Sequence, residues 1–238
     1  MEAIPATALS ANLAANATQK NQLGIVGRFN YSGNTGTITR FGGKAQNASA
    51  LMFAGEAYNV EMGITNELFP TERDETAGCA SATTSNSCTL MSACAGVNTL
   101  SSMEMVGIFV RFLAPPAPSA TMPGGAPSIM HGKQVFASTG CALCHTPSFA
   151  TGDNTVLALR NQNVNLYSDL ALHQMGPQLA DDIQQGEAAG DEFRTAPLWA
   201  SASASSSCTM AARMISRRPS SCTRAAASQN TRPRRRTP

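Results

Sequence analysis

The 238-residue sequence has few aromatic residues, 5% of the total, and a single tryptophan. It has no apolar run of 18 residues that would span a membrane, and its first residues lack both the basic start and the apolar stretch of a signal peptide. A phosphate-binding loop, a dinucleotide fingerprint and a Ser/His/Asp nucleophile set are also missing. These absences argue against a membrane-spanning protein, a nucleotide-dependent enzyme and a serine hydrolase. The length is sufficient for one or two domains with a buried core.

Acidic residues are absent from one end of the chain. The net charge of +2 combines −6 over residues 1–199, where nine basic and fifteen acidic residues lie, with +8 from the eight arginines of residues 200–238. A basic segment of this kind can bind nucleic acid or an anionic membrane. This one has no interleaved aromatic residues and no amphipathic helical pattern, so we expect no nucleic-acid partner.

The stretch Cys141-Ala-Leu-Cys144-His145 carries the most specific chemistry of the sequence. Thiols one helical turn apart can reach both vinyl groups of one porphyrin, and the next residue can place an imidazole under the iron. A disulfide, half of a zinc site or a thioredoxin-like pair are the alternatives, but no second Cys-x-x-Cys and no βαβ pattern accompany the motif. We therefore predict one haem c, attached at Cys141 and Cys144, with His145 as the proximal iron ligand. The flat macrocycle would supply part of the apolar volume that aromatic residues do not.

The sixth position of such an iron needs a ligand or stays open. Met175 is the candidate distal ligand, and His173 is the alternative. A thioether would raise the reduction potential and favour electron transfer, whereas a second imidazole would lower it. Either residue could instead pack in the core or, for His173, bind a propionate or a carbonyl. His131 precedes the motif and is expected at the surface.

Apolar spacing and breaker residues predict four helices, and the segment before them is expected to be mostly loop. The helices are expected near residues 47–62, 99–113, 129–138 and 177–185, after a loop over residues 1–40. The polar insert at 71–97 holds Cys79, Cys88 and Cys94, which we interpret as one local disulfide with an odd cysteine. We divide the chain into an N-terminal helical and loop region (1–113), a Pro/Gly linker (114–128), a haem domain (129–199) and a low-complexity basic tail (200–238).

Several short stretches of the sequence occur together in an informative order. They are Glu2–Pro5, Arg40–Gln46, Glu61–Asn66, Phe112–Pro116, Gly132–His145, Leu166–Asp169, Gly176 and Glu192–Trp199. Over residues 2–199 this ordered set resembles the di-haem thiol-oxidoreductase family, relatives of the bacterial di-haem cytochrome c peroxidases. The resemblance implies a mostly α-helical, cytochrome c-like fold with long irregular loops. It also implies a peroxidase-like or electron-transfer role in the periplasm, with a small redox protein as electron donor or acceptor.

The chain departs from that family in three places. It has one Cys-x-x-Cys-His motif where the family has two, so we expect the first motif, and a signal peptide, upstream of Met1. Gly43 stands where the family has a tryptophan, the residue type that relays electrons between haems in related enzymes. After Trp199 the sequence becomes Ser-, Ala- and Arg-rich; in another reading frame Ser207–Arg213 is compatible with the family motif Leu-His-Asp-Gly-Arg-Thr. We interpret residues 200–238 as an out-of-frame, disordered tail.

The resulting hypothesis is a c-type haem redox protein, a fragment of a di-haem peroxidase-like oxidoreductase. A monohaem electron-carrier cytochrome, a non-functional truncated or frameshifted product, and a structural zinc or disulfide protein are the alternatives.

Overall fold

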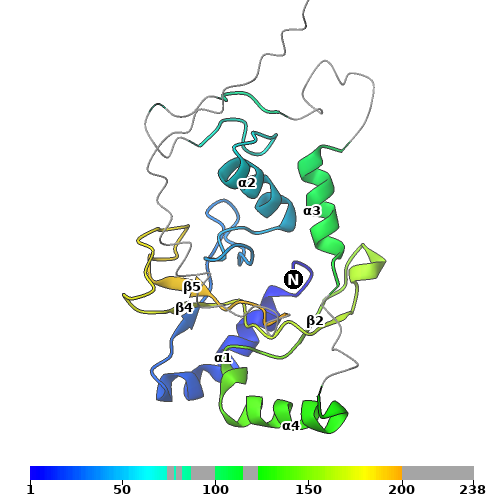
Figure 1. Ribbon diagram of the computed structural model, residues 1–238, viewed down its shortest axis with the longest axis vertical. Helices are drawn as coiled ribbons and strands as arrows, with labels where there is room; N and C mark the ends of the chain where they lie inside the picture. Colours follow the sequence, from blue (N-terminus) through cyan, green and yellow to red (C-terminus); the bar gives the residue numbers. More distant parts are fainter. Residues whose placement is uncertain (74–77, 79–81, 87–99, 115–122, 200–238) are drawn as a thin grey trace, which may run out of the picture.

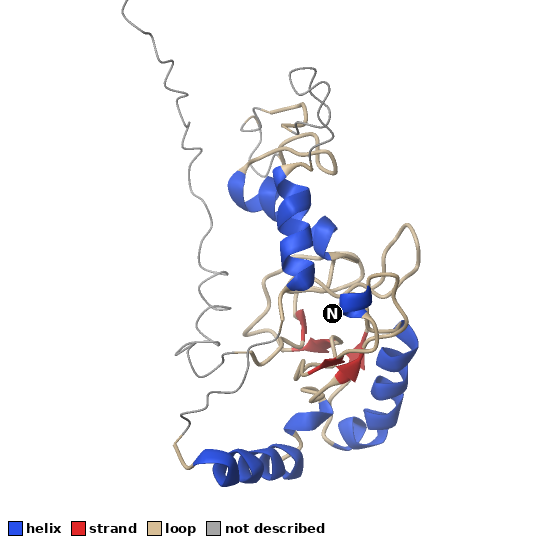
Figure 2. Ribbon diagram, turned by 90° about the vertical axis from the view of Figure 1, so that its right-hand side faces the viewer, coloured by secondary structure: helices blue, strands red, loops and turns tan. Residues whose placement is uncertain are grey.

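A computed structural model describes residues 1–73, 78, 82–86, 100–114 and 123–199. Within them lie four α-helices, two short 3₁₀ helices and five short strands. The α-helices are α1 (Ala6–Gln22), α2 (Ala50–Met62), α3 (Ser102–Phe112) and α4 (Gly125–Ser138), and the 3₁₀ helices are η2 (Cys141–Leu143) and η3 (Leu157–Leu159). The strands are β1 (Gly27–Arg28), β2 (Phe149–Ala150), β3 (Asn163–Val164), β4 (Leu172–Gln174) and β5 (Glu192–Arg194). Helices α2 and α3 lie at one end of the molecule and α4 at the other, with the strands between them (Figures 1 and 2).

Helix α1 is the longest helix of the described chain, and it falls where a loop was predicted. It begins directly after Pro5 and contains six alanines, the residue with the highest helix propensity. Only Leu9 and Lys20 of this helix are buried. The helix was missed because its pattern of apolar residues is weak; its stability rests on alanine content and on these two contacts.

The predicted helices at 47–62, 99–113 and 129–138 are confirmed as α2, α3 and α4, with shifted ends. Gly63 ends α2 in the left-handed conformation (φ 66°), as its position predicts. The buried face of α2 is formed by small and polar side chains instead of large apolar ones. The helix buries small and polar residues, Ala50, Ala54, Gly55 and Asn59, while Met52 and Met62 are exposed.

Two small antiparallel sheets join segments that are distant in the sequence. In the larger sheet the central strand β4 pairs with β1 on one side and β5 on the other, so that His173 lies opposite Gly27 and Phe193. The smaller sheet pairs β2 with β3. The main hydrophobic core likewise combines residues from both halves of the chain. It contains Ile4, Leu9, Phe29, Ile38, Phe149, Leu166, Leu170 and Ala171.

The prediction of a mostly α-helical, cytochrome c-like fold is therefore wrong. Two antiparallel sheets and long irregular loops make up much of the described structure, and the run Leu166–Leu172 enters the core as loop and strand. The predicted helix at 177–185 is also wrong, because Asp182 and Gly186 both take left-handed conformations there. The domain boundary at 114–128 stays a prediction, since residues 115–122 lie outside the described residues, as do Cys79, Cys88, Cys94 and the tail at 200–238.

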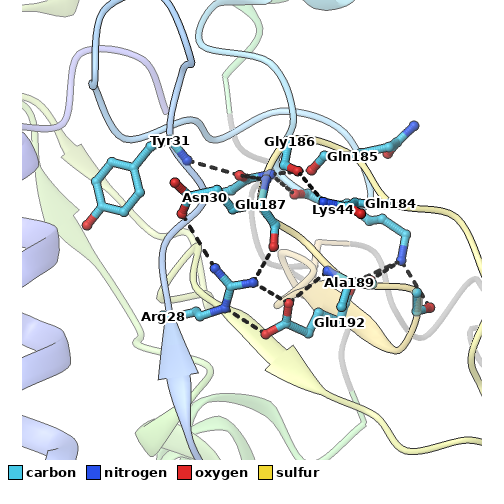
Figure 3. A network of polar contacts seen from close by, with 11 residues as sticks. Arg28, Asn30, Tyr31, Lys44, Gln184, Gln185, Gly186, Glu187, Ala189 and Glu192 are labelled. Atoms are coloured by element: carbon cyan, nitrogen blue, oxygen red, sulfur yellow. Dashed lines mark hydrogen bonds and ion pairs between the residues drawn. The ribbon is translucent and has the colours of Figure 1, made fainter.

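Side chains from the N-terminal segment hold the loop at 181–192 in place of helical hydrogen bonds (Figure 3). Asn30 donates to the Gln185 carbonyl at 2.8 Å, and buried Lys44 donates to the Ala189 carbonyl at 2.8 Å. Arg28 donates through Nε to Glu192 Oε1 at 2.7 Å. Because these partners satisfy the polar groups of the loop, the segment is ordered without regular secondary structure.

Candidate haem-attachment site

Helix α4 leads directly into the cysteine motif. The helix ends at Ser138, Gly140 takes a left-handed conformation (φ 82°), and the chain then turns through η2. Cys141 is exposed and Cys144 half-buried, and both thiols are free. Thr139 Oγ1 lies 3.4 Å from the Cys141 sulfur. The motif therefore presents two unpaired thiols on a single tight turn at the end of a helix.

His145 continues this turn and is held by the segment that follows the second sheet. Its amide donates to the Cys141 carbonyl at 2.9 Å, and its Nδ1 lies 2.9 Å from the Tyr167 carbonyl oxygen. Since a carbonyl can only accept, Nδ1 is the donor, and in the neutral imidazole the lone pair is then on Nε2. This is the tautomer in which a neutral histidine binds a metal, with the second nitrogen bonded to a protein oxygen.

Residues before and after His145 pair with the loop at 167–169. Tyr167 donates its amide to the Pro147 carbonyl at 3.2 Å, and the Asp169 amide donates to the Cys144 carbonyl at 2.8 Å. The Tyr167 ring also meets Phe136 of α4 edge to face, with 5.8 Å between the ring centroids. The loop thus contacts the motif on both sides of His145.

Behind the motif lies a buried charge network that we define as Lys20, Asp169 and His173. Asp169 Oδ2 accepts from Lys20 Nζ at 2.7 Å and from His173 Nε2 at 3.1 Å. The Lys20 and Asp169 side chains are 2% and 1% exposed. The Cys144 sulfur belongs to the same cluster, in which one donor atom each of Cys144, Asp169 and His173 lies within 4.8 Å of the others.

The electrostatics of this network favour its charged form. Burial raises the pKa of Asp169, but hydrogen bonds from His173 and Lys20 outweigh it and hold that pKa below its usual range. Burial lowers the pKa of His173, yet the hydrogen bond to Asp169 and the nearby Cys144 thiol raise it to about 9. At neutral pH the network therefore holds two cations and one carboxylate, an arrangement unsuited to a further cation.

The structure separates the two candidates for the sixth ligand. His173 lies in the central strand, is 8% exposed, and donates from Nε2 to Asp169. Its buried Nδ1 has no hydrogen-bond partner among the described residues. Met175 is 50% exposed, and its amide donates to the Asp191 carbonyl at 2.8 Å. His131 is exposed on α4.

Lys20 and Asp169 were not singled out by the sequence. A signal for Asp169 existed, because it stands before the apolar run Leu170–Leu172 and four residues before His173. Lys20 gave none, since a lysine near the end of a helix normally lies in solvent.

The donor set of this site, two free thiols followed by an imidazole with an available Nε2, suits a haem-binding redox protein. A sequence model of the family described as "di-haem oxidoreductase, putative peroxidase" matches residues 2–215, so the chain belongs to this family. The match extends past Trp199 into the basic tail. No curated protein and no solved structure matches the chain. Among the described residues, no helix has the length and hydrophobicity needed to cross a membrane.

Proposed function

We propose that this chain binds one haem covalently through Cys141 and Cys144, with His145 as the proximal ligand, and acts within a di-haem, peroxidase-like oxidoreductase. The observation that carries the proposal is the hydrogen bond from His145 Nδ1 to the Tyr167 carbonyl, which leaves Nε2 free beside two unpaired thiols. When bound, the haem supplies a reversible one-electron change at its iron. The chain's own residues attach, orient and cover it.

Helix α4 supports this assignment because it is little covered by the rest of the described structure. None of its residues is buried, and Met130 and Val135 are 64% and 42% exposed. A large apolar ring attached to the turn that follows would give this helix an apolar neighbour. We propose Val135 and Phe136 as residues that face the haem.

Met175 is the donor we propose for the sixth position. His173 is engaged by Asp169, whereas the Met175 side chain is half exposed. A stable thioether ligand would favour a simple electron carrier, and a labile one would favour reaction with peroxide. Replacing Met175 with leucine tests the assignment: loss of the thioether-to-iron charge-transfer band is expected, and an unchanged low-spin spectrum contradicts it.

We further propose a periplasmic location and a small redox protein as electron partner. Covalent haem attachment and a content of seven cysteines suit an oxidising compartment such as the periplasm.

Haem staining of a denaturing gel, combined with intact mass, tests the attachment. After expression with the haem maturation machinery, the mass should equal the chain plus one haem. The Cys141→Ala/Cys144→Ala variant should lose the stain completely. His131→Ala, which changes an exposed histidine on α4, is the matched control and should keep it. A wild-type chain that is colourless, with no Soret band, refutes the proposal.

A further inference from the structure

The loop that holds His145 contains two residues with a strained backbone. Tyr167 and Leu170 have φ angles of 51° and 58°, in the left-handed region that residues with a side chain avoid. Such a conformation is unfavourable and persists only where the surrounding contacts impose it. The carbonyl that accepts from His145 belongs to Tyr167 itself. The strained residue is therefore the one that fixes the direction of the imidazole.

Asp169, between these two residues, is the point where the loop is tied to the rest of the molecule. Its Oδ2 accepts from Lys20 of α1 and from His173 of β4, and its Oδ1 accepts from the Ala171 amide at 3.0 Å. Its own amide donates to the Cys144 carbonyl. One residue thus connects a helix, the central strand and the cysteine turn.

Two other functions of this cluster fit less well. A metal bound by Cys144, Asp169 and His173 would lie beside the Lys20 ammonium, which is 2.7 Å from the Asp169 oxygen and repels a cation. A contribution to stability alone is also a weak explanation, because a buried ion pair is about as stabilising as well-packed apolar side chains of the same volume. Unlike apolar side chains, the charged partners of Asp169 fix one defined geometry of the loop.

We propose that Asp169, anchored by Lys20, is a positioning residue for His145 and acts through the Tyr167 carbonyl. The inference rests on the proposed haem attachment. Asp169 keeps the loop in its strained form, so that the Tyr167 oxygen stays 2.9 Å from His145 Nδ1. A firm hydrogen bond at Nδ1 makes the imidazole a stronger electron donor to the iron and holds the reduction potential down.

The midpoint potential of the attached haem tests this role. Asp169→Asn removes a negative charge and Lys20→Met a positive one, so charge alone would shift the potential in opposite directions, whereas loss of positioning shifts it in the same direction. Asp169→Asn keeps the size of the side chain but places an amide against Lys20 and His173. We expect haem-loaded Asp169→Asn to have a more positive midpoint potential than wild type, and Lys20→Met to shift it in the same direction by less. Glu192→Gln, which weakens the Arg28–Glu192 ion pair without contacting the 167–170 loop, is the matched control and should leave the potential unchanged.

The outcomes separate this inference from the proposed function. Wild-type protein without covalent haem overturns both. A folded, haem-loaded Asp169→Asn variant whose potential matches that of Glu192→Gln overturns only the positioning role. Failure of both Asp169→Asn and Lys20→Met to fold also overturns it, because the charge network would then serve the fold instead of the ligand.

Discussion

The pairing of Gly27 with His173 gives the sharpest test of how the sheet and the buried charge network depend on each other. Gly27 lies opposite His173 in the β1–β4 register, and it does not have a left-handed φ. A methyl group added here would lie 2.7 Å from His173 Cε1 and 3.1 Å from Leu13 Cδ1. The backbone tolerates alanine at this position, so any cost comes from the contact with the ring.

The His173 ring cannot move away from the added methyl group without a cost in stability. The His173 ring is buried and tied to Asp169, so moving it away weakens a hydrogen bond between charged groups. Overpacking of this kind costs about 1–3 kcal/mol, and a charged hydrogen bond contributes about 1.5–3 kcal/mol. Because the two effects overlap, we expect Gly27→Ala to lower the free energy of unfolding by about 2–3 kcal/mol. The melting temperature should fall by about 4–12 °C.

Urea unfolding followed by far-UV circular dichroism measures the change. Gly33→Ala is the control, because a methyl group there meets nothing within 4 Å and Gly33 does not have a left-handed φ. It should be neutral or stabilising by up to about 1 kcal/mol. Equal midpoints for the two variants would refute the close packing of Gly27 against the ring.

Three further predictions concern the helix pair and the charge network. Gly107→Ala would place a methyl group 3.0 Å from the Leu51 Cα, so it should force α3 away from α2 and destabilise the chain by about 1–3 kcal/mol in urea. Ser101→Ala removes one half of the capping box with Glu104 and should cost about 1 kcal/mol in the same assay. The raised pKa of His173 stabilises the fold fully below pH 6.5, and this contribution is lost as the pH rises through about 9. The lowered pKa of Asp169 stabilises it above pH 3.8 and is lost on acidification. The free energy of unfolding in urea should therefore be highest between about pH 4 and 6.5 and fall by on the order of 2 kcal/mol towards pH 9. The Asp169→Asn variant should lose that alkaline fall.

Local signals in the sequence were sufficient for α2, α3 and α4, where apolar spacing coincides with a clear stop such as Gly63. They failed for α1, whose alanines favour a helix but mark no buried face. They failed again at 177–185, where Asn30 donates to the Gln185 carbonyl and Lys44 pairs with Asp181, each from more than a hundred residues earlier. Contacts between residues so far apart in the sequence leave no periodic pattern in either segment. The error in fold class therefore follows from long-range pairing.

The candidate site also has one part that local sequence signals predict and one part that depends on long-range contacts. Cys141, Cys144 and His145 are contiguous, and their chemistry can be inferred from spacing alone. The surroundings of these three residues cannot be inferred from spacing, because the groups that orient them come from α1 and from the loop before β4.

The strained loop explains why the motif alone does not define a ligand. A free histidine exchanges its proton between two nitrogens, and only one of the two tautomers presents Nε2 to a metal. In this chain the choice is made by the Tyr167 carbonyl, whose direction requires a left-handed residue, and that residue is adjacent to a segment fixed by Asp169. An isolated peptide containing Cys141–His145 would have the same donors without this orientation. The buried pair of Lys20 and Asp169 therefore connects the fold of the N-terminal helix to the chemistry expected at His145.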